Sequence, residues 1–260
     1  MKKIFFGILL LLFQNFSFSQ SIVNTEKLFT TNDEGIGISS ELAGSAISGN
    51  TSILVLEYGL NFSFKRNKNY FRLLSGGEYM NENNEEVANG LFSQLRYNYF
   101  FNKKLRFFAF TQVQKNSILL LERRFLVGSG IRRNLIDIKK DSTNRYEFDV
   151  SLGLMQEEEL LNKTNLPSNE MNYTNYTRAI FSLVGVIDIK GKYTIVNTTY
   201  FQQYLGKFSD FRLLNETNLL VQLNDWLNFN IDIEYRYDNE PPSILLDKDL
   251  NINLGFILNL

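Results

Sequence analysis

The sequence predicts an all-β fold: a transmembrane, antiparallel, up-and-down β-barrel of about twelve strands. Apolar and polar residues alternate along most of the chain, which is the pattern of strands with two different faces. The alternating segments run for roughly 10–14 residues, whereas a tilted strand needs about 9–11 residues to cross a bilayer and strands of soluble sheets commonly have about 5–6. Proline, which interrupts central strands, occurs only 3 times in 260 residues.

The first residues are typical of a secretory signal peptide. Lys2 and Lys3 are followed by the apolar run 4–13, and Ser17 and Ser19 are small residues of the kind that signal peptidase reads. A short membrane anchor is the alternative, but the run is shorter than the roughly 20 apolar residues that span a bilayer. We therefore expect a signal peptide over 1–19, a short periplasmic leader over 20–34 and an outer-membrane barrel over 35–260.

The strands follow in order, with the clearest alternation from Leu54 to Phe64 and from Leu227 to Tyr237. The full set that we expect is Gly35–Ile47, Leu54–Phe64, Tyr70–Met80, Leu91–Phe101, Leu105–Gln114, Arg123–Leu135, Tyr146–Leu154, Tyr173–Val186, Tyr193–Tyr204, Phe211–Leu223, Leu227–Tyr237 and Ile252–Leu260. Tyr173–Val186 and Tyr193–Tyr204 alternate poorly, so the count is open by about two strands.

The connecting segments alternate between short and long. Polar turns are expected at Arg66–Asn69, Asn102–Lys104, Lys190–Lys192 and Asn224–Asp225, and longer loops at Asn81–Val87, Glu157–Asn172 and Asp238–Asp249. Short turns at one end and longer loops at the other are typical of outer-membrane barrels, with the short turns in the periplasm. Ser48–Asn50, which is short, and Asp137–Asn144, which is long, depart from this rule.

An apolar face on every strand must be covered, and no amphipathic helix is available to cover it. In hydrocarbon only a closed sheet without edges satisfies its backbone groups, so lipid is the expected cover. The alternative is a soluble secreted β-sandwich that acts as a binding module. Aromatic residues near the strand ends favour a girdle at the membrane interface: Phe62, Phe64, Tyr70, Phe71, Tyr99, Phe101, Phe107, Trp226 and Phe229.

Composition excludes several kinds of chemistry. The chain has no cysteine and no histidine, so disulfides, thiolate metal sites and every His-based catalytic arrangement are impossible. Without the two lysines of the signal peptide, 25 basic residues face 28 acidic ones, a net charge of −3, which does not suggest nucleic-acid binding. We expect no enzyme and no cofactor or metal; a His-independent membrane enzyme is the less favoured alternative.

Several segments resemble an uncharacterised outer-membrane family described as salt-induced outer membrane proteins. They are Ser39–Leu42 followed by Ser48–Thr51, then Leu95–Phe100 and the ending Tyr235–Pro242. The resemblance covers roughly residues 35–260 and implies a barrel in the outer membrane, with no established activity. It fails over Glu157–Asn172, which is acidic and rich in asparagine.

The inward positions of the expected strands carry many charges, with arginine in the strands and lysine in the turns. The candidate lumen-lining charges are Glu57, Arg72, Glu78, Arg96, Arg106, Arg124, Arg132, Arg145, Glu147, Asp149, Arg212, Glu216, Asp232, Glu234 and Arg236. They predict either a narrow charged pore or ion pairs that fill the interior and hold the barrel shut. The acidic run Glu157–Glu159 is interpreted as part of a solvated loop, with binding of Ca²⁺ or of lipopolysaccharide-bridging cations as the alternative.

The expected function is that of a structural envelope component or a narrow passive pore for small solutes, in the outer membrane of a Gram-negative bacterium. Its expected partners are outer-membrane lipid, lipopolysaccharide and small solutes or ions. The barrel-insertion machinery is a further expected partner, through the final strand Ile252–Leu260, although such strands usually end in Phe rather than Leu.

Overall fold

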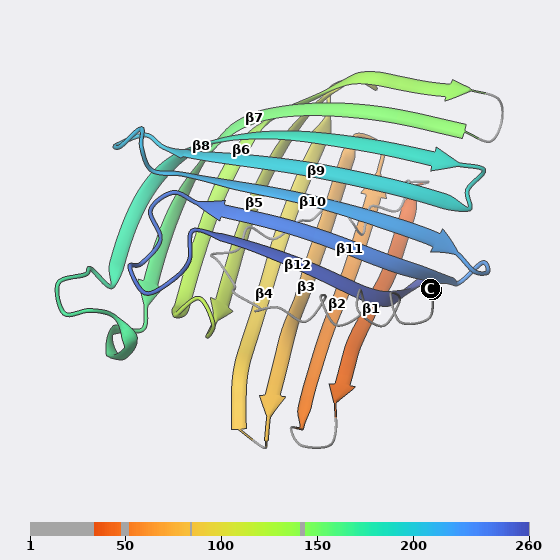
Figure 1. Cartoon of the computed structure of the whole chain (residues 1–260). Helices are drawn as coiled ribbons and strands as arrows, with labels where there is room; N and C mark the ends of the chain where they lie inside the picture. The colour runs from red at the N-terminus through yellow and green to blue at the C-terminus, as the bar shows by residue number, and fades with distance from the viewer. Residues whose placement is uncertain (1–33, 48–51, 84, 141–143, 260) are drawn as a thin grey trace, which may run out of the picture.

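The computed structural model describes residues 34–47, 52–83, 85–140 and 144–259, and these residues form a closed barrel (Figure 1). Its strands are β1 (Gly35–Ile47), β2 (Ile53–Arg66), β3 (Asn69–Glu82), β4 (Glu85–Phe100), β5 (Leu105–Asn116), β6 (Leu121–Lys140), β7 (Asn144–Leu161), β8 (Tyr173–Ile189), β9 (Tyr193–Tyr204), β10 (Phe211–Gln222), β11 (Leu227–Asp238) and β12 (Lys248–Asn259). One 3-10 turn, η1 (Lys163–Asn165), follows β7. The predicted antiparallel barrel of about twelve strands is therefore confirmed.

Each strand pairs antiparallel with its neighbours in sequence, and β1 closes the ring against β12. The closing register runs from Ser39↔Asn259 to Ala43↔Gly255. A closed ring has no unpaired edge, so the alternative of two stacked sheets is wrong. The signal peptide and leader up to residue 33, Ser48–Asn50 and Leu260 lie outside the described residues.

The two faces of the wall have opposite chemistry. On β2 the alternate residues from Leu54 to Phe64 are apolar and exposed, and Leu60 is 51 % exposed. Asn61 and Ser63, between them, are 1 % and 4 % exposed and face the interior. A strand points successive side chains to opposite faces, so this pattern wraps an apolar belt around a polar interior.

The barrel has two different ends. The loop end carries the connections 162–172, 205–210 and 239–247, and the turn end carries the short connections 67–68, 190–192 and 223–226. Three sequence-based boundaries are wrong. The expected loop Asn81–Val87 is mostly strand, because β3 runs to Glu82 and β4 starts at Glu85. Glu157–Leu161 belongs to β7 rather than to a loop, and β6 runs to Lys140 with β7 starting at Asn144, because backbone pairing continues where the apolar alternation stops.

One of the expected girdle residues points the other way. Tyr70 is 1 % exposed and lies on the inner face with Arg72, whereas Phe71 between them is 44 % exposed and faces outward. The parity of β3 decides this, since neighbouring residues of a strand cannot both face lipid. No helix of the described residues is long and apolar enough to cross a membrane.

β6 and β7 approach closely where two glycines pair across the strands, Gly130 with Gly153. A Cβ on Gly153 would lie 2.4 Å from the Ser129 carbonyl oxygen, and one on Gly130 would lie 2.3 Å from the Leu152 carbonyl oxygen. We expect Gly153→Ala to lower the free energy of unfolding by about 1–3 kcal/mol, because backbone must move. Urea unfolding measures it; Gly185→Ala, whose Cβ meets nothing within 4 Å, is the control, and equal stability of the two variants would refute the close approach.

Candidate functional site

The charged residues predicted for the interior all lie on the inward-facing positions of their strands. Arg72, Arg96, Arg124, Arg132, Arg212, Glu216 and Asp232 are buried. Glu57, Glu78, Arg106, Arg145, Glu147, Asp149, Glu234 and Arg236 are half-buried. Their part in solute passage stays a prediction.

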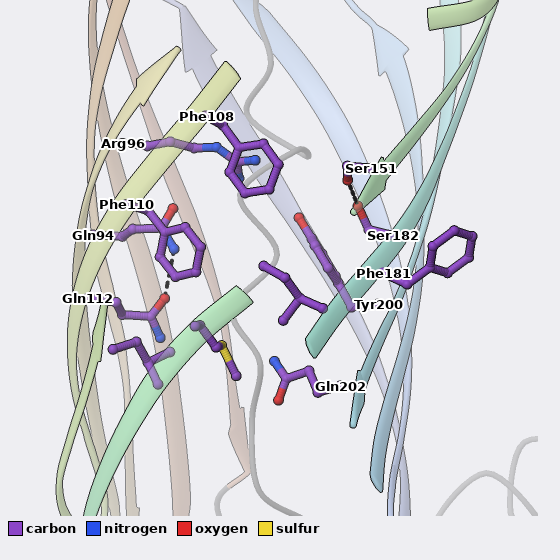
Figure 2. A pocket seen from close by; sticks show the side chains of 13 residues that line it. Gln94, Arg96, Phe108, Phe110, Gln112, Ser151, Phe181, Ser182, Tyr200 and Gln202 are labelled. Atoms are coloured by element: carbon purple, nitrogen blue, oxygen red, sulfur yellow. Dashed lines mark hydrogen bonds between the residues drawn. The ribbon is translucent and has the colours of Figure 1, made fainter. Parts of the chain in front are cut away.

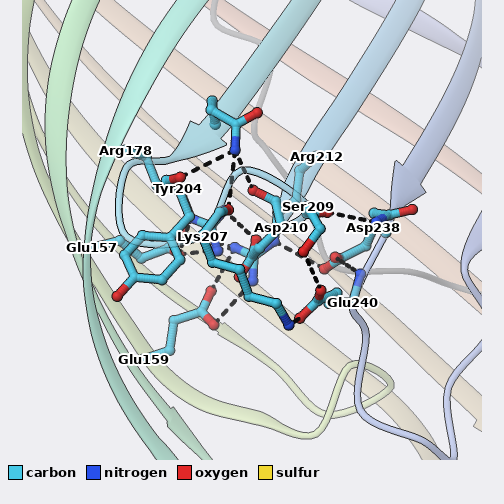
Figure 3. A network of polar contacts seen from close by, with 12 residues as sticks. Glu157, Glu159, Arg178, Tyr204, Lys207, Ser209, Asp210, Arg212, Asp238 and Glu240 are labelled. Atoms are coloured by element: carbon cyan, nitrogen blue, oxygen red, sulfur yellow. Dashed lines mark hydrogen bonds and ion pairs between the residues drawn. The ribbon is translucent and has the colours of Figure 1, made fainter.

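A dense group of ion pairs crosses the interior near the loop end (Figure 3), and we call it the loop-end network. At its centre, Arg212 Nη1 on β10 lies 2.9 Å from Glu157 Oε2 and 2.9 Å from Glu159 Oε1, both on β7. Arg124 Nε on β6 donates to Glu159 Oε1 at 2.5 Å, and Arg178 Nε on β8 donates to Glu157 Oε1 at 2.8 Å. Arg212 on β10 thus contacts β7, with β8 and β9 lying between the two strands in the ring.

Two aspartates complete the loop-end network. Arg178 Nη1 donates to Asp210 Oδ1 at 2.7 Å, and Arg212 Nε donates to Asp238 Oδ2 at 2.9 Å. The network therefore joins three arginines and four carboxylates: Arg124, Arg178, Arg212, Glu157, Glu159, Asp210 and Asp238. Arginine suits this role because its planar guanidinium serves several carboxylate oxygens at once.

Burial makes the pairing in the network necessary. The side chains of Arg178 and Glu157 are 0 % and 1 % exposed. Taking a charge out of water costs several kcal/mol, which only close, multiple pairing offsets. The network consequently behaves as a unit, in which the loss of one charge leaves the others buried without a partner.

An aromatic pair covers the β8–β9 side of the network. Tyr176 and Tyr204 stack with ring centroids 4.1 Å apart. The Arg178 guanidinium carbon lies 5.6 Å from the Tyr176 centroid and 5.8 Å from the Tyr204 centroid. Its Nη2 makes no hydrogen bond within the described residues, so the ring faces supply its remaining stabilisation through cation–π attraction.

The long connections at the loop end are tied to one another. Lys207 pairs with Glu240, and Ser209 Oγ donates to Glu240 Oε1 at 3.1 Å. The backbone N–H of Ser243 donates to Glu170 Oε1 at 3.1 Å, which joins the 239–247 and 162–172 connections. The hydrogen bond from Lys207 lowers the pKa of Glu240 and raises that of Lys207. This pairing is lost as the pH falls through the Glu240 pKa or rises through the Lys207 pKa, and it contributes little stability because its side chains are 54 % and 33 % exposed.

A second, smaller group lies toward the turn end. Arg106 Nη2 donates to Asp149 Oδ2 at 2.8 Å, and Asn134 Nδ2 donates to Asp149 Oδ1 at 2.8 Å. Arg132 Nη1 lies 3.9 Å from the same carboxylate. Arg145 pairs with Glu147 on the same strand. The predicted charges thus form ion pairs near both ends of the barrel.

Between these groups the inner wall is partly apolar (Figure 2). A cavity of about 50 Å³ lies among Phe108, Phe110, Met155 and Tyr200, which is room for a few water molecules. Arg96 lies over the Phe108 ring at 5.1 Å. Among the described residues, no group of Asp and Glu side chains could hold a metal ion.

The sequence missed five members of the loop-end network: Glu157, Glu159, Arg178, Asp210 and Asp238. The acidic run was assigned to a solvated loop, whereas Glu157 and Glu159 are 1 % and 3 % exposed inside the barrel. Parity could have found three of the five. Glu157 and Glu159 continue the inward positions of Ser151 and Met155, and Asp238 continues those of Asp232, Glu234 and Arg236.

The fold has counterparts among solved structures. The NanC porin matches with a TM-score of 0.50 and 9% identity over 85% of this chain and 98% of that one. The KdgM porin matches with a TM-score of 0.45 and 11% identity over 86% and 99%. The transport unit of the autotransporter AIDA-I from Escherichia coli matches with a TM-score of 0.43 and 11% identity over 91% and 94%. The NanC likeness supports the porin-like barrel fold.

A comparison with curated proteins gives no match. A family model described as "Protein of unknown function, DUF481" matches residues 40–257, which is most of the chain and nearly the whole barrel. The chain therefore belongs to the DUF481 family.

Proposed function

We propose that this protein is an integral outer-membrane barrel that forms a narrow passive pore for small solutes, with the loop-end network as its narrowest and most charged section. The single observation that carries the proposal is the two-faced wall of the closed ring, with a largely apolar outer face and a largely polar inner face. In water, an apolar belt of this size would be a large exposed patch, whereas in lipid it is the expected surface. The turn end then faces the periplasm.

A second candidate is a closed structural barrel of the envelope. It is favoured by the burial of the loop-end network, in which Arg178 and Glu157 have almost no exposed surface. A polar interior serves both candidates, since Arg–carboxylate pairs can hold a barrel shut as well as line a path. The salt-induced description that the resemblance implies stays a prediction.

Planar-bilayer recordings distinguish the two. For the pore we expect single-channel steps smaller than those of a 16-stranded porin measured in the same apparatus, because fewer strands enclose a narrower lumen. Silence of barrels whose insertion has been verified by protease protection would refute the pore and support the closed barrel.

A matched pair of variants locates the path of the ions. Glu159→Gln removes a negative charge from the network, so the reversal potential in a salt gradient should shift toward anion preference. Glu158→Gln is the control, because Glu158 is on the outer face and pairs with the exposed Arg123. Equal shifts in both variants, or none in Glu159→Gln, would show that ions do not pass the loop-end network.

A further inference from the structure

The outer face of the barrel carries four polar side chains at the centre of one strand pair. Asn197 and Thr199 lie on β9, and Asn215 and Thr217 lie opposite them on β10, in the pairs Asn197↔Thr217 and Thr199↔Asn215. We call these four residues the amide patch. The inward positions between them, Thr198 and Glu216, are 0 % and 2 % exposed, so parity places the amide patch on the outside.

The amide patch lies at mid-height of the wall. The β9–β10 register runs from Gln203↔Phe211 to Tyr193↔Val221, and its central pair, Thr198↔Glu216, is flanked on both sides by the patch. In a barrel that spans a bilayer this level is hydrocarbon, out of reach of lipid headgroups and water. The inference therefore rests on the membrane location in the proposed function.

Apolar residues and a glycine surround the amide patch. On the same outer face, Gly185 and Leu183 of β8 pair with Asn197 and Thr199, and Ile233 and Tyr235 of β11 pair with Thr217 and Asn215. Along β9 and β10 the next outward residues are Ile195, Phe201, Leu213 and Leu219. The patch is thus a polar island in an apolar belt.

The four side chains hydrogen-bond to one another. Asn197 Nδ2 donates to Thr217 Oγ1 at 2.8 Å, and Asn215 Nδ2 donates to Thr199 Oγ1 at 2.7 Å. The two amides also donate to each other at 3.4 and 3.5 Å, so each carbonyl oxygen accepts one long hydrogen bond and keeps its second lone pair. Hydrocarbon offers no donor to these second lone pairs, and an unmade hydrogen bond there is unfavourable.

Lipid tails offer the amide patch no hydrogen bond, so the occupant that fits it is protein. In membranes, Asn and Thr side chains hydrogen-bond across protein interfaces, and small residues let the backbones approach. Gly185 supplies such a small position, because a Cβ added to it would have no other atom within 4 Å. The amide patch carries no charge and has both donors and acceptors, which makes it complementary to itself.

We propose that the amide patch is the centre of a two-fold dimer interface between two copies of this chain. Two barrels inserted to the same depth can only be related by an axis along the membrane normal, which keeps every residue at its own height. A two-fold axis therefore places Asn197 and Asn215 of one copy against the same residues of the other. In a ring of three or more copies, the amide patch of one copy would instead contact a different face of the next copy. An example is the outer face of β2, whose residues from Leu54 to Phe64 are apolar and offer no hydrogen bond.

Cysteine cross-linking tests the dimer, because the chain contains no cysteine of its own. Gly185→Cys sits beside the amide patch in open space, and Leu60→Cys on β2 is a control on another part of the belt. In native membranes treated with a short bismaleimide, Gly185→Cys should give a dimer band at least about tenfold stronger than Leu60→Cys gives. Equal bands, or bands larger than a dimer, would overturn the proposal.

A second pair of variants keeps the test independent of the cross-linker. Asn197→Leu combined with Asn215→Leu should shift the protein from dimer to monomer in mild detergent, measured by light scattering after size exclusion. Thr111→Leu, on the outer face of β5, should leave the dimer intact. A wild-type monomer, or a double variant that still dimerises, would overturn the dimer while leaving the pore untouched. Absence of the protein from the outer-membrane fraction would instead count against the proposed function.

Discussion

Arg212→Met should lower the free energy of unfolding of the barrel by about 3–5 kcal/mol, the usual cost of breaking a buried ion pair from one side. Methionine keeps much of the volume of arginine, so the effect isolates the charge. Glu157, Glu159 and Asp238 would each lose a donor at 2.9 Å in a place where water does not replace it. Urea unfolding of the protein folded in vesicles, followed through the single tryptophan, Trp226, measures the change.

The matched control is Arg123 on β6, an arginine outside the loop-end network. Arg123 donates to Glu158 at 2.8 Å, close to the 2.9 Å at which Arg212 meets its carboxylate partners, but its side chain is 56 % exposed. Arg123→Met should therefore cost less than about 1 kcal/mol. If both substitutions cost the same, the loop-end network is hydrated and does not close the interior.

A double variant separates lost pairing from lost packing. Arg212→Met leaves two glutamates short of positive charge, so adding Glu159→Gln should restore part of the stability, even though it removes a further ionic partner. A purely additive loss would mean that Arg212 stabilises the barrel through its packing alone.

Alternation was enough to predict the barrel because the physics behind it is local. A strand with lipid on one side must place apolar residues at every second position, and β2 and β11 obey this without exception between Leu54 and Phe64 and between Leu227 and Tyr237. The same rule gave the inward side of each predicted charge. The girdle prediction was wrong for Tyr70, because it used only the position near a strand end and not the parity that turns this side chain inward.

The loop-end network could not be predicted in the same way. Past Leu154, the outward positions of β7 hold Gln156 and Glu158, so both faces are polar and the sequence pattern of this segment predicts a loop. Arg212 and Glu157 are 55 residues apart, and their contact depends on the stagger of the strands around the ring. That stagger is a property of the closed barrel as a whole, so no single strand of the sequence carries it.

The other large effect concerns the outer face. Leu60, in the middle of β2, is 51 % exposed on the apolar belt. Leu60→Arg should cost about 2–4 kcal/mol of stability in vesicles, because a guanidinium at mid-height of a bilayer loses its hydration. On a surface facing water, the same substitution would be within about ±0.5 kcal/mol.

A second position at a different depth in the bilayer is the control for the effect of lipid. Leu223 is 54 % exposed, nearly the same as Leu60, but it lies at the turn end, immediately after β10. An arginine there can reach the headgroups and water, so Leu223→Arg should cost about 0–1 kcal/mol. Unfolding in urea from vesicles, compared for the two variants, measures the difference. Similar small costs at both positions would mean that the apolar belt faces water or another protein rather than hydrocarbon, and the membrane location would then be wrong.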